Sequence, residues 1–268
     1  MKGAILALLV LALPVPAAGL TLDGPLTQGG LVVGRAPPGT RVTLDGAPVR
    51  VSQDGLFLLG FGRDAPARAE LSLTGPDGRT ETRDLKVAAR EYPVQRIEGL
   101  PEKKVSPPPE DLERIRRESA QVAEARKADT ARPFFGDGFV WPADGVVSGV
   151  FGSQRILNGK PRAPHNGVDI AASTGTPVRA MGAGIVRLAH PDMLLTGRTL
   201  MIDHGHGLTS VYLHLEDIRV AEGREVAKGT VIGSVGKSGR ATGPHLHWGV
   251  NLFATALDPV LVVAEPKP

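Results

Sequence analysis

The segment Thr242-Gly243-Pro244-His245-Leu246-His247-Trp248 places two histidines two positions apart. If the segment is extended, both imidazoles point to the same face, with their Cα atoms about 6.6 Å apart at about 3.3 Å rise per residue. Two imidazoles at that separation can converge on one metal ion or one reacting water. The segment therefore predicts a site on one face of a strand, which the rest of the chain must complete.

The composition favours a β-rich protein. The chain has 268 residues, with 34 Gly, 23 Pro and 4% aromatic residues, which implies many turns and little helix. This length exceeds a typical domain of about 100–200 residues, so we expect one medium domain and a smaller module. The predicted fold class is mainly β.

Cysteine content and charge exclude several classes of function. The chain has no Cys, so it has no disulfide, no thiolate zinc site, no Cys nucleophile and no lipidated Cys. Any metal site must then use His and carboxylates. The net charge is +3 and basic residues do not cluster with aromatics, so we expect no nucleic-acid partner. A mildly basic protein is compatible with an acidic envelope polymer.

Residues 1–18 resemble a bacterial secretory signal peptide. Lys2 precedes the apolar run Ala4–Leu13, and small residues suited to cleavage end at Ala17 and Ala18. The apolar run is much shorter than the roughly 20 residues that span a bilayer. We expect an exported protein without stable membrane insertion after cleavage; an uncleaved anchor is the alternative.

Residues 19–88 predict a small β-sandwich-like domain. Short apolar or alternating runs are separated by turn pairs such as Asp45-Gly46 and Asp54-Gly55, at a spacing near ten residues. The expected strands are Leu31–Val33, Arg41–Leu44, Val49–Val51, Leu56–Leu59 and Ala69–Leu73. This part lacks a cluster of candidate catalytic residues, so we expect a binding or spacing role.

Residues 89–131 predict a linker with one helix. Pro107-Pro108-Pro109 favours a stiff extended stretch, and the periodic pattern predicts a helix over Glu110–Ala128. This helix is either a simple connection or a lid over a site. From Pro133 onward the pattern is again β with many Gly turns, and all seven His lie there.

A second candidate motif is His165-Asn166-Gly167-Val168-Asp169. In a straight strand, His165 and Asp169 would share a face but lie about 13 Å apart, too far for one ion. The segment must therefore bend, and Gly167 permits this, with His165 on a loop and Asp169 in a strand Val168–Ala171. A hydrolytic zinc site usually has three protein ligands and a water. These two residues and one of the two C-terminal His would supply that number.

The other histidines have different expected roles. His204 and His206 lie among Asp203, Gly205 and Gly207, which predicts a hairpin turn and a poor pair of ligands. His190 is expected at the surface. His214 ends the expected strand Ser210–Leu213, and it is either a buried histidine with a satisfied hydrogen bond or the proton donor or acceptor that a hydrolytic site needs.

Three ordered motifs resemble those of the lysostaphin/LytM-type zinc metallopeptidases, which cut peptide bonds in bacterial peptidoglycan. The motifs are His165-x-Gly167-x-Asp169, Tyr212-Leu213-His214-Leu215 and Gly243-Pro244-His245-Leu246-His247. The resemblance covers about residues 138–263. It implies that residues 132–268 form a peptidase domain, with a compact antiparallel β-sheet and a groove along it. Gly249 departs from the pattern, since many members carry Glu there.

The resemblance also implies the role of each site residue. Zn²⁺ would be held by His165, Asp169 and His247, while His214 and His245 would act in catalysis beside the metal. The spacing of the two C-terminal His does not distinguish them; only the resemblance does. Which of His214 and His245 is the base stays open.

Two functional hypotheses follow. The first is an exported zinc endopeptidase, periplasmic or attached to the cell envelope, that hydrolyses peptide bonds in peptidoglycan stems or cross-links through a metal-activated water. The alternative is a non-enzymatic regulator of other wall hydrolases with the same fold. The helix Glu110–Ala128 or the loop Gln154–Ala163 could restrict the groove, in which case deletion of Leu20–Ala128 should raise activity. The bond that is cut and any protein partner stay open.

Overall fold

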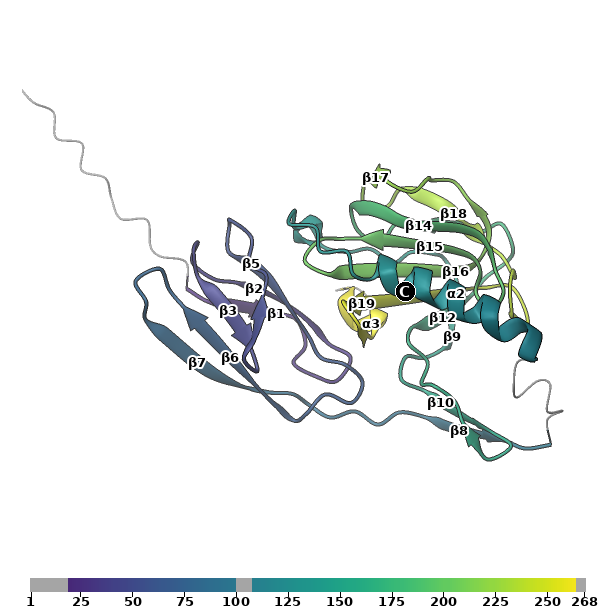
Figure 1. Ribbon diagram of the computed structural model, residues 1–268, viewed down its shortest axis with the longest axis horizontal. Coiled ribbons are helices and arrows are strands. Elements are labelled where there is room, and N and C mark those ends of the chain that lie inside the picture. Colours follow the sequence, from purple (N-terminus) through teal and green to yellow (C-terminus); the bar gives the residue numbers. More distant parts are fainter. Residues whose placement is uncertain (1–18, 100–107, 264–268) are drawn as a thin grey trace, which may run out of the picture.

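A computed structural model describes residues 19–99 and 108–263 (Figure 1). The predicted signal peptide, residues 1–18, and Pro107 of the predicted proline stretch lie outside the described residues. Among the described helices, we find none that is long and apolar enough to cross a bilayer.

The N-terminal part forms two small antiparallel sheets that pack face to face, which we call the N-terminal sandwich. The first sheet has the order β1 (Thr21–Asp23), β2 (Leu31–Arg35), β5 (Leu56–Gly60). The second has the order β4 (Ala47–Val49), β3 (Arg41–Leu44), β6 (Arg68–Thr74), β7 (Thr80–Lys86). Their inward residues, including Val32, Phe57 and Leu71, share one buried core, as the turn spacing predicts.

Two details of the sandwich differ from the prediction. The strand expected at Val49–Val51 is Ala47–Val49, because the tight turn at Asp45-Gly46 lets pairing begin directly after it. Strand β7 was not expected, because all but one of its residues are exposed and six of the seven are charged or Thr. It adds to β6 at one edge of the second sheet, where only Leu85 reaches the core.

The linker contains strand β8 (Val94–Ile97) and helix α2 (Pro109–Ala125), which ends three residues before the expected Ala128. Val122 and Ala125 of α2 pack against Met193 and Met201 of the main sheet. The buried carboxylate of Glu118 accepts a hydrogen bond from the backbone N–H of Leu194 at 2.8 Å. This helix is therefore docked on the sheet through both apolar and polar contacts.

The main sheet has ten strands, and every pairing within it is antiparallel, as the resemblance implies. Its order is β17-β14-β15-β16-β19-β12-β9; β18 pairs with β13 and β16, and β20 with β19 (Figure 1). The bounds are β9 Val146–Gly149, β12 Val168–Ala171, β13 Pro177–Arg179, β14 Gly184–Met193, β15 Gly197–Asp203, β16 Leu208–Ile218, β17 Glu225–Val226, β18 Val231–Val235, β19 His245–Leu252 and β20 Thr255–Leu257. Short helices η1 (Phe134–Asp137) and α3 (Pro259–Val262) flank the sheet. Its core includes the fully buried Ile170, Tyr212, Leu246 and Trp248.

A third sheet joins the linker to the segment that precedes His165. Strand β8 pairs in parallel with β10 (Gln154–Leu157), which forms a hairpin with β11 (Lys160–Pro161). The segment Gln154–Ala163, expected as a loop, is therefore partly a hairpin. Parallel pairing between segments so far apart in sequence leaves no local pattern by which it could be predicted.

The predicted hairpin turn at His204 and His206 is confirmed, between β15 and β16. His204 is fully buried; its Nδ1 lies 2.7 Å from the carbonyl oxygen of Ala183 and its Nε2 lies 2.8 Å from Ser210 Oγ. Burial lowers the pKa of His204 from 6.5 to about 4. His204 is therefore a neutral core imidazole in the folded protein.

This buried imidazole predicts a loss of stability in acid. Between pH 6.5 and about 4 the unfolded chain binds a proton at His204 that the folded chain does not. The contribution of His204 to the free energy of unfolding is therefore fully present above pH 6.5 and is lost as the pH falls toward 4. We expect His204 to account for about 2.5 kcal/mol of the loss between pH 7 and pH 4.5. Guanidinium unfolding of metal-free protein at both pH values measures this. The variant His204→Gln should lose that much less stability than wild type between them; His190→Gln is the matched control, and equal losses in wild type and His204→Gln would refute the assignment.

Candidate metal centre

Strands β12 and β19 bring two candidate ligands side by side. His245 and His247 alternate along β19 with the buried Leu246 and Trp248, so both imidazoles lie on the open face of the sheet. Asp169 is the direct cross-strand partner of His247 in the β12–β19 register. Cross-strand partners share a face, and the Asp169 carboxylate therefore lies next to the His247 ring.

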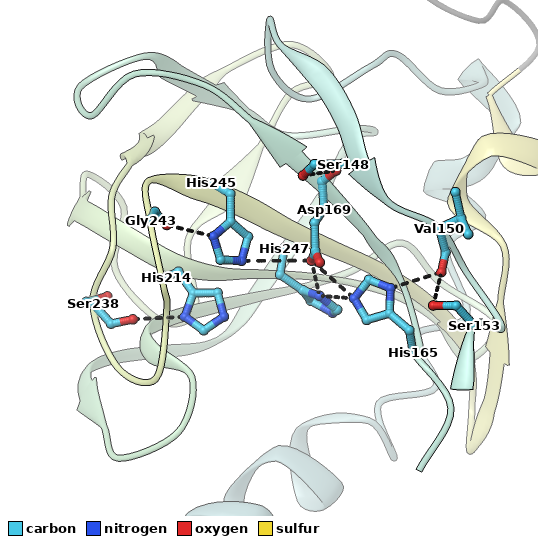
Figure 2. Close-up of polar contacts among 10 residues, drawn as sticks. All are labelled: Ser148, Val150, Ser153, His165, Asp169, His214, Ser238, Gly243, His245 and His247. Atoms are coloured by element: carbon cyan, nitrogen blue, oxygen red, sulfur yellow. Dashed lines mark hydrogen bonds and ion pairs between the residues drawn. The ribbon is translucent and has the colours of Figure 1, made fainter. Parts of the chain in front are cut away.

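His165 reaches the same point from the loop before β12. The predicted bend is confirmed, because His165 Nε2 lies 3.1 Å from Asp169 Oδ1. Two backbone hydrogen bonds hold the loop: the N–H of Gly152 donates to the carbonyl of His165, and the N–H of His165 donates to that of Ser153, both at 2.8 Å. The ring is oriented by the carbonyl of Val150, 3.1 Å from Nδ1 (Figure 2).

Three donor atoms form a small triangle. His165 Nε2 and His247 Nδ1 are 3.0 Å apart, and Asp169 Oδ1 lies 3.1 and 2.9 Å from them (Figure 2). The Val150 carbonyl accepts the Nδ1 proton of His165, which leaves the Nε2 lone pair directed at the other two donors. Tetrahedral zinc with bonds of about 2.0–2.2 Å would space its ligand atoms by about 3.3 Å. The size, count and chemistry of the triangle fit a divalent zinc-like ion.

The protonation states also suit a metal. Burial alone would raise the pKa of Asp169, but hydrogen bonds and charge attraction from His165 and His247 lower it well below its ordinary value. Burial lowers the pKa of His247, which favours its neutral form. An anionic carboxylate and neutral imidazoles are the states that bind metal ions.

His214 and His245 face each other beside this triangle. Their ring centroids are 4.8 Å apart, and His245 Nε2 lies 3.9 Å from Asp169 Oδ1. Each ring directs Nδ1 at a backbone carbonyl, His214 at Ser238 (2.8 Å) and His245 at Gly243 (2.9 Å) (Figure 2). A neutral ring held in this way keeps its Nε2 lone pair for a reacting group.

The backbone at His214 differs from the prediction. The expected strand ended at Leu213, but β16 continues to Ile218, and His214 sits in a bulge with a left-handed φ of 62°. The β15–β16 register passes from Leu200–Tyr212 to Arg198–Leu215, so two β16 residues face one of β15. The bulge re-aims the side chain, and burial lowers the pKa of His214 to about 4.

Comparison with known proteins adds the family. Residues 163–259 match the model of peptidase family M23. This range includes the three residues of the triangle as well as His214 and His245. The crystal structure of a putative peptidase M23 from Pseudomonas aeruginosa matches with a TM-score of 0.65 and 30% identity, and the match covers 90% of this chain and 96% of that one. The chain belongs to peptidase family M23.

Curated M23 relatives match over a shorter region. The chain is 46% identical over 105 residues to the peptidoglycan DD-endopeptidase ShyA of Vibrio cholerae, which is 38% of this chain and 24% of that protein. It is 42% identical over 104 residues to the DD-carboxypeptidase/endopeptidase Mpg of Neisseria meningitidis, 39% of this chain and 24% of that protein. The matched region spans about a quarter of the length of these relatives.

Some groups that orient the histidines of this site could not be predicted from the sequence. The carbonyls of Val150, Ser238 and Gly243 orient three of the four histidines, and any residue type could provide them. Only the fold brings them into place. Gly149 carries a weak signal, since a Cβ there would collide with the Asp169 carboxylate.

Gly167 packs directly against strand β19 and the ring of His247. A Cβ at this position would collide with the carbonyl of Trp248 and lie 2.9 Å from His247 Nε2, so Gly167→Ala must displace the β19 backbone or the His247 ring. We expect zinc affinity to fall by about tenfold or more, as measured by competition with a chromophoric chelator. The matched control is Gly136→Ala, whose Cβ would make an ordinary 3.5 Å contact with Leu56. Equal affinity of Gly167→Ala and wild type would contradict this account.

Proposed function

We propose that the protein is an exported zinc endopeptidase that hydrolyses peptide bonds in peptidoglycan. The observation that carries the proposal is the convergence of His165, Asp169 and His247 on one point, with the rings of His214 and His245 beside it. Names of the relatives support the substrate class and favour DD-endopeptidase activity. The proposed location is the periplasm or cell envelope, on the strength of the signal-like residues 1–18.

In this proposal, His165, Asp169 and His247 hold Zn²⁺. When bound, the ion would lower the pKa of a water toward about 7 and polarise the scissile carbonyl. Three protein ligands is the number found in catalytic rather than closed structural sites. The two neutral ligand imidazoles and the half-buried carboxylate supply one negative charge, so a bound divalent ion would keep a net positive charge for the developing oxyanion.

His214 and His245 move the protons. Their Nδ1 atoms face carbonyls, so Nε2 is the atom on each ring that can accept the proton of the attacking water. Once protonated, that Nε2–H becomes a donor that can deliver the proton to the leaving amine. The ring centroids of the two imidazoles are 4.8 Å apart, so the second imidazole can stabilise the negative charge that develops on the carbonyl oxygen.

The regulator hypothesis makes a different prediction. An endopeptidase should release soluble peptides from purified wall sacculi when protein lacking residues 1–18 and loaded with zinc is the sole protein present. Chelation should stop the release and added zinc should restore it. A regulator would release none alone and would instead accelerate release by an added wall hydrolase, an outcome that would overturn the enzymatic proposal.

A further inference from the structure

The position of His165 depends on a short backbone segment. Its N–H and carbonyl are bonded to Ser153 and Gly152, and its Nδ1 faces the carbonyl of Val150. Asp169 and His247, in contrast, lie on paired strands inside the main sheet. Whatever holds residues 150–153 therefore holds the one loop-borne ligand of the proposed metal site.

The N-terminal sandwich and the linker hold that segment. Arg63, which follows β5, donates from Nε to the carbonyl of Gly152 at 2.8 Å. In the linker, the carbonyl of Pro93 accepts the N–H of Gln154 at 2.9 Å, at the start of the β8–β10 pairing. The ring of Tyr92 leaves no space for a Cβ on Gly152, whose φ is 78°. Each contact involves Gly152 or lies within two residues of it.

Tyr92 is held by contacts with Phe151 near the His165 loop and with two arginines, Arg63 and Arg90. Its ring packs edge-to-face on Phe151, with centroids 6.2 Å apart, and the guanidinium carbons of Arg63 and Arg90 lie 4.6 and 5.3 Å from its centroid. Arg90 bonds the carbonyl of Gln28 in the sandwich and pairs with Asp258, next to the main sheet, at 2.8 Å. These contacts form a continuous packed path from the sandwich to the His165 loop.

We propose that Tyr92 and Arg63 are positioning residues for His165, so that the N-terminal sandwich and linker raise the metal affinity of the M23 site. The inference rests on the proposed metal site. A loop already held in its binding geometry loses less freedom when the ion binds, and partners one step removed from a ligand typically change metal affinity by about 10–100-fold. This proposal and the lid hypothesis make different predictions. Under this proposal, loss of the N-terminal part should weaken metal binding even if it also opens the groove.

The test compares matched variants of the protein lacking residues 1–18. Tyr92→Ala removes the ring, while Tyr92→Phe keeps it and loses only a hydroxyl that has no hydrogen-bond partner among the described residues. Arg63→Ala removes the bond to Gly152. Arg83→Ala removes an arginine of the same sandwich that pairs with Glu81 and is not among the ring and cation contacts of Tyr92. Zinc dissociation constants are measured by competition with a chromophoric chelator, and thermal unfolding of the metal-free proteins checks folding.

We expect Tyr92→Ala and Arg63→Ala to bind zinc about tenfold or more weakly, with Tyr92→Phe and Arg83→Ala within about twofold of wild type. In metal-free protein, hydrogen exchange at the amides of Gly152 and His165 should be faster in Tyr92→Ala and Arg63→Ala than in either control. Arg63 is partly exposed, so its variant decides the question should Tyr92→Ala not fold.

Wild-type affinity and exchange in both alanine variants would overturn the positioning role and leave the proposed function standing. A wild-type protein that binds no zinc would overturn both. Weaker zinc binding in Arg83→Ala equal to that in Arg63→Ala would also overturn the proposal, because the effect would then not pass through the His165 loop.

Discussion

Replacing His247 with alanine is expected to abolish zinc binding and, with it, release of peptides from wall sacculi. The change removes one of three donors, and Nδ1 of His247 is the donor nearest to Asp169 Oδ1, at 2.9 Å. Loss of a direct ligand should weaken zinc binding by more than about 100-fold, since partners one step removed already cost 10–100-fold. Zinc per chain after gel filtration, and soluble peptides by mass spectrometry, measure the two effects.

The matched control for this substitution is His190→Ala. His190 lies in β14, where its Nδ1 accepts the backbone N–H of Asp192, and it belongs to none of the contacts around Asp169. That variant should retain one zinc per chain and normal peptide release. A His247→Ala protein that still retains one zinc and releases peptides would show that the metal, or the chemistry, lies elsewhere.

Substitution of His214 or His245 should separate chemistry from metal binding. We expect zinc to stay bound while the cleavage rate falls by about 10²–10⁴-fold, the usual contribution of general acid–base catalysis. For His214 the informative change is His214→Asn, because Asn tolerates the left-handed backbone with φ of 62° and removes only the imidazole. For His245 the change is His245→Ala. Rates are measured per zinc-loaded chain.

A matched control exists for the strained position as well. His206 also has a left-handed φ, 51°, but lies in the β15–β16 turn, where its Nε2 faces the carbonyl of Ala131. His206→Asn should keep the rate per zinc-loaded chain. Near-normal rates for both His214→Asn and His245→Ala would rule out the proposed proton-transfer roles, and loss of zinc from either variant would show that the residue supports metal binding instead.

Sequence patterns predict the centre of the site well where they reflect strand geometry. The period of two residues placed His245 and His247 on one face of β19, and their buried neighbours Leu246 and Trp248 show why. The four-residue spacing of His165 and Asp169 required a bend, which lies before β12. These inferences follow from local backbone geometry and need no long-range information.

Long-range pairing and backbone groups could not be predicted in the same way. The parallel β8–β10 pairing joins segments about 60 residues apart, and strand β7 has a polar pattern typical of a loop. The bulge at His214 depends on the register between β15 and β16, which two strands set together. Carbonyls such as that of Val150 are present in every residue, so only the fold determines which of them orients a histidine.

The most direct test of the central claim is digestion of purified sacculi in H₂¹⁸O by zinc-loaded protein alone, followed by mass spectrometry of the soluble products. The account predicts peptide fragments with one new amino terminus and one new carboxylate that carries a single ¹⁸O atom, formed only while zinc is bound. Products cut in the glycan strand, or no soluble products from protein that retains one zinc per chain, would contradict it.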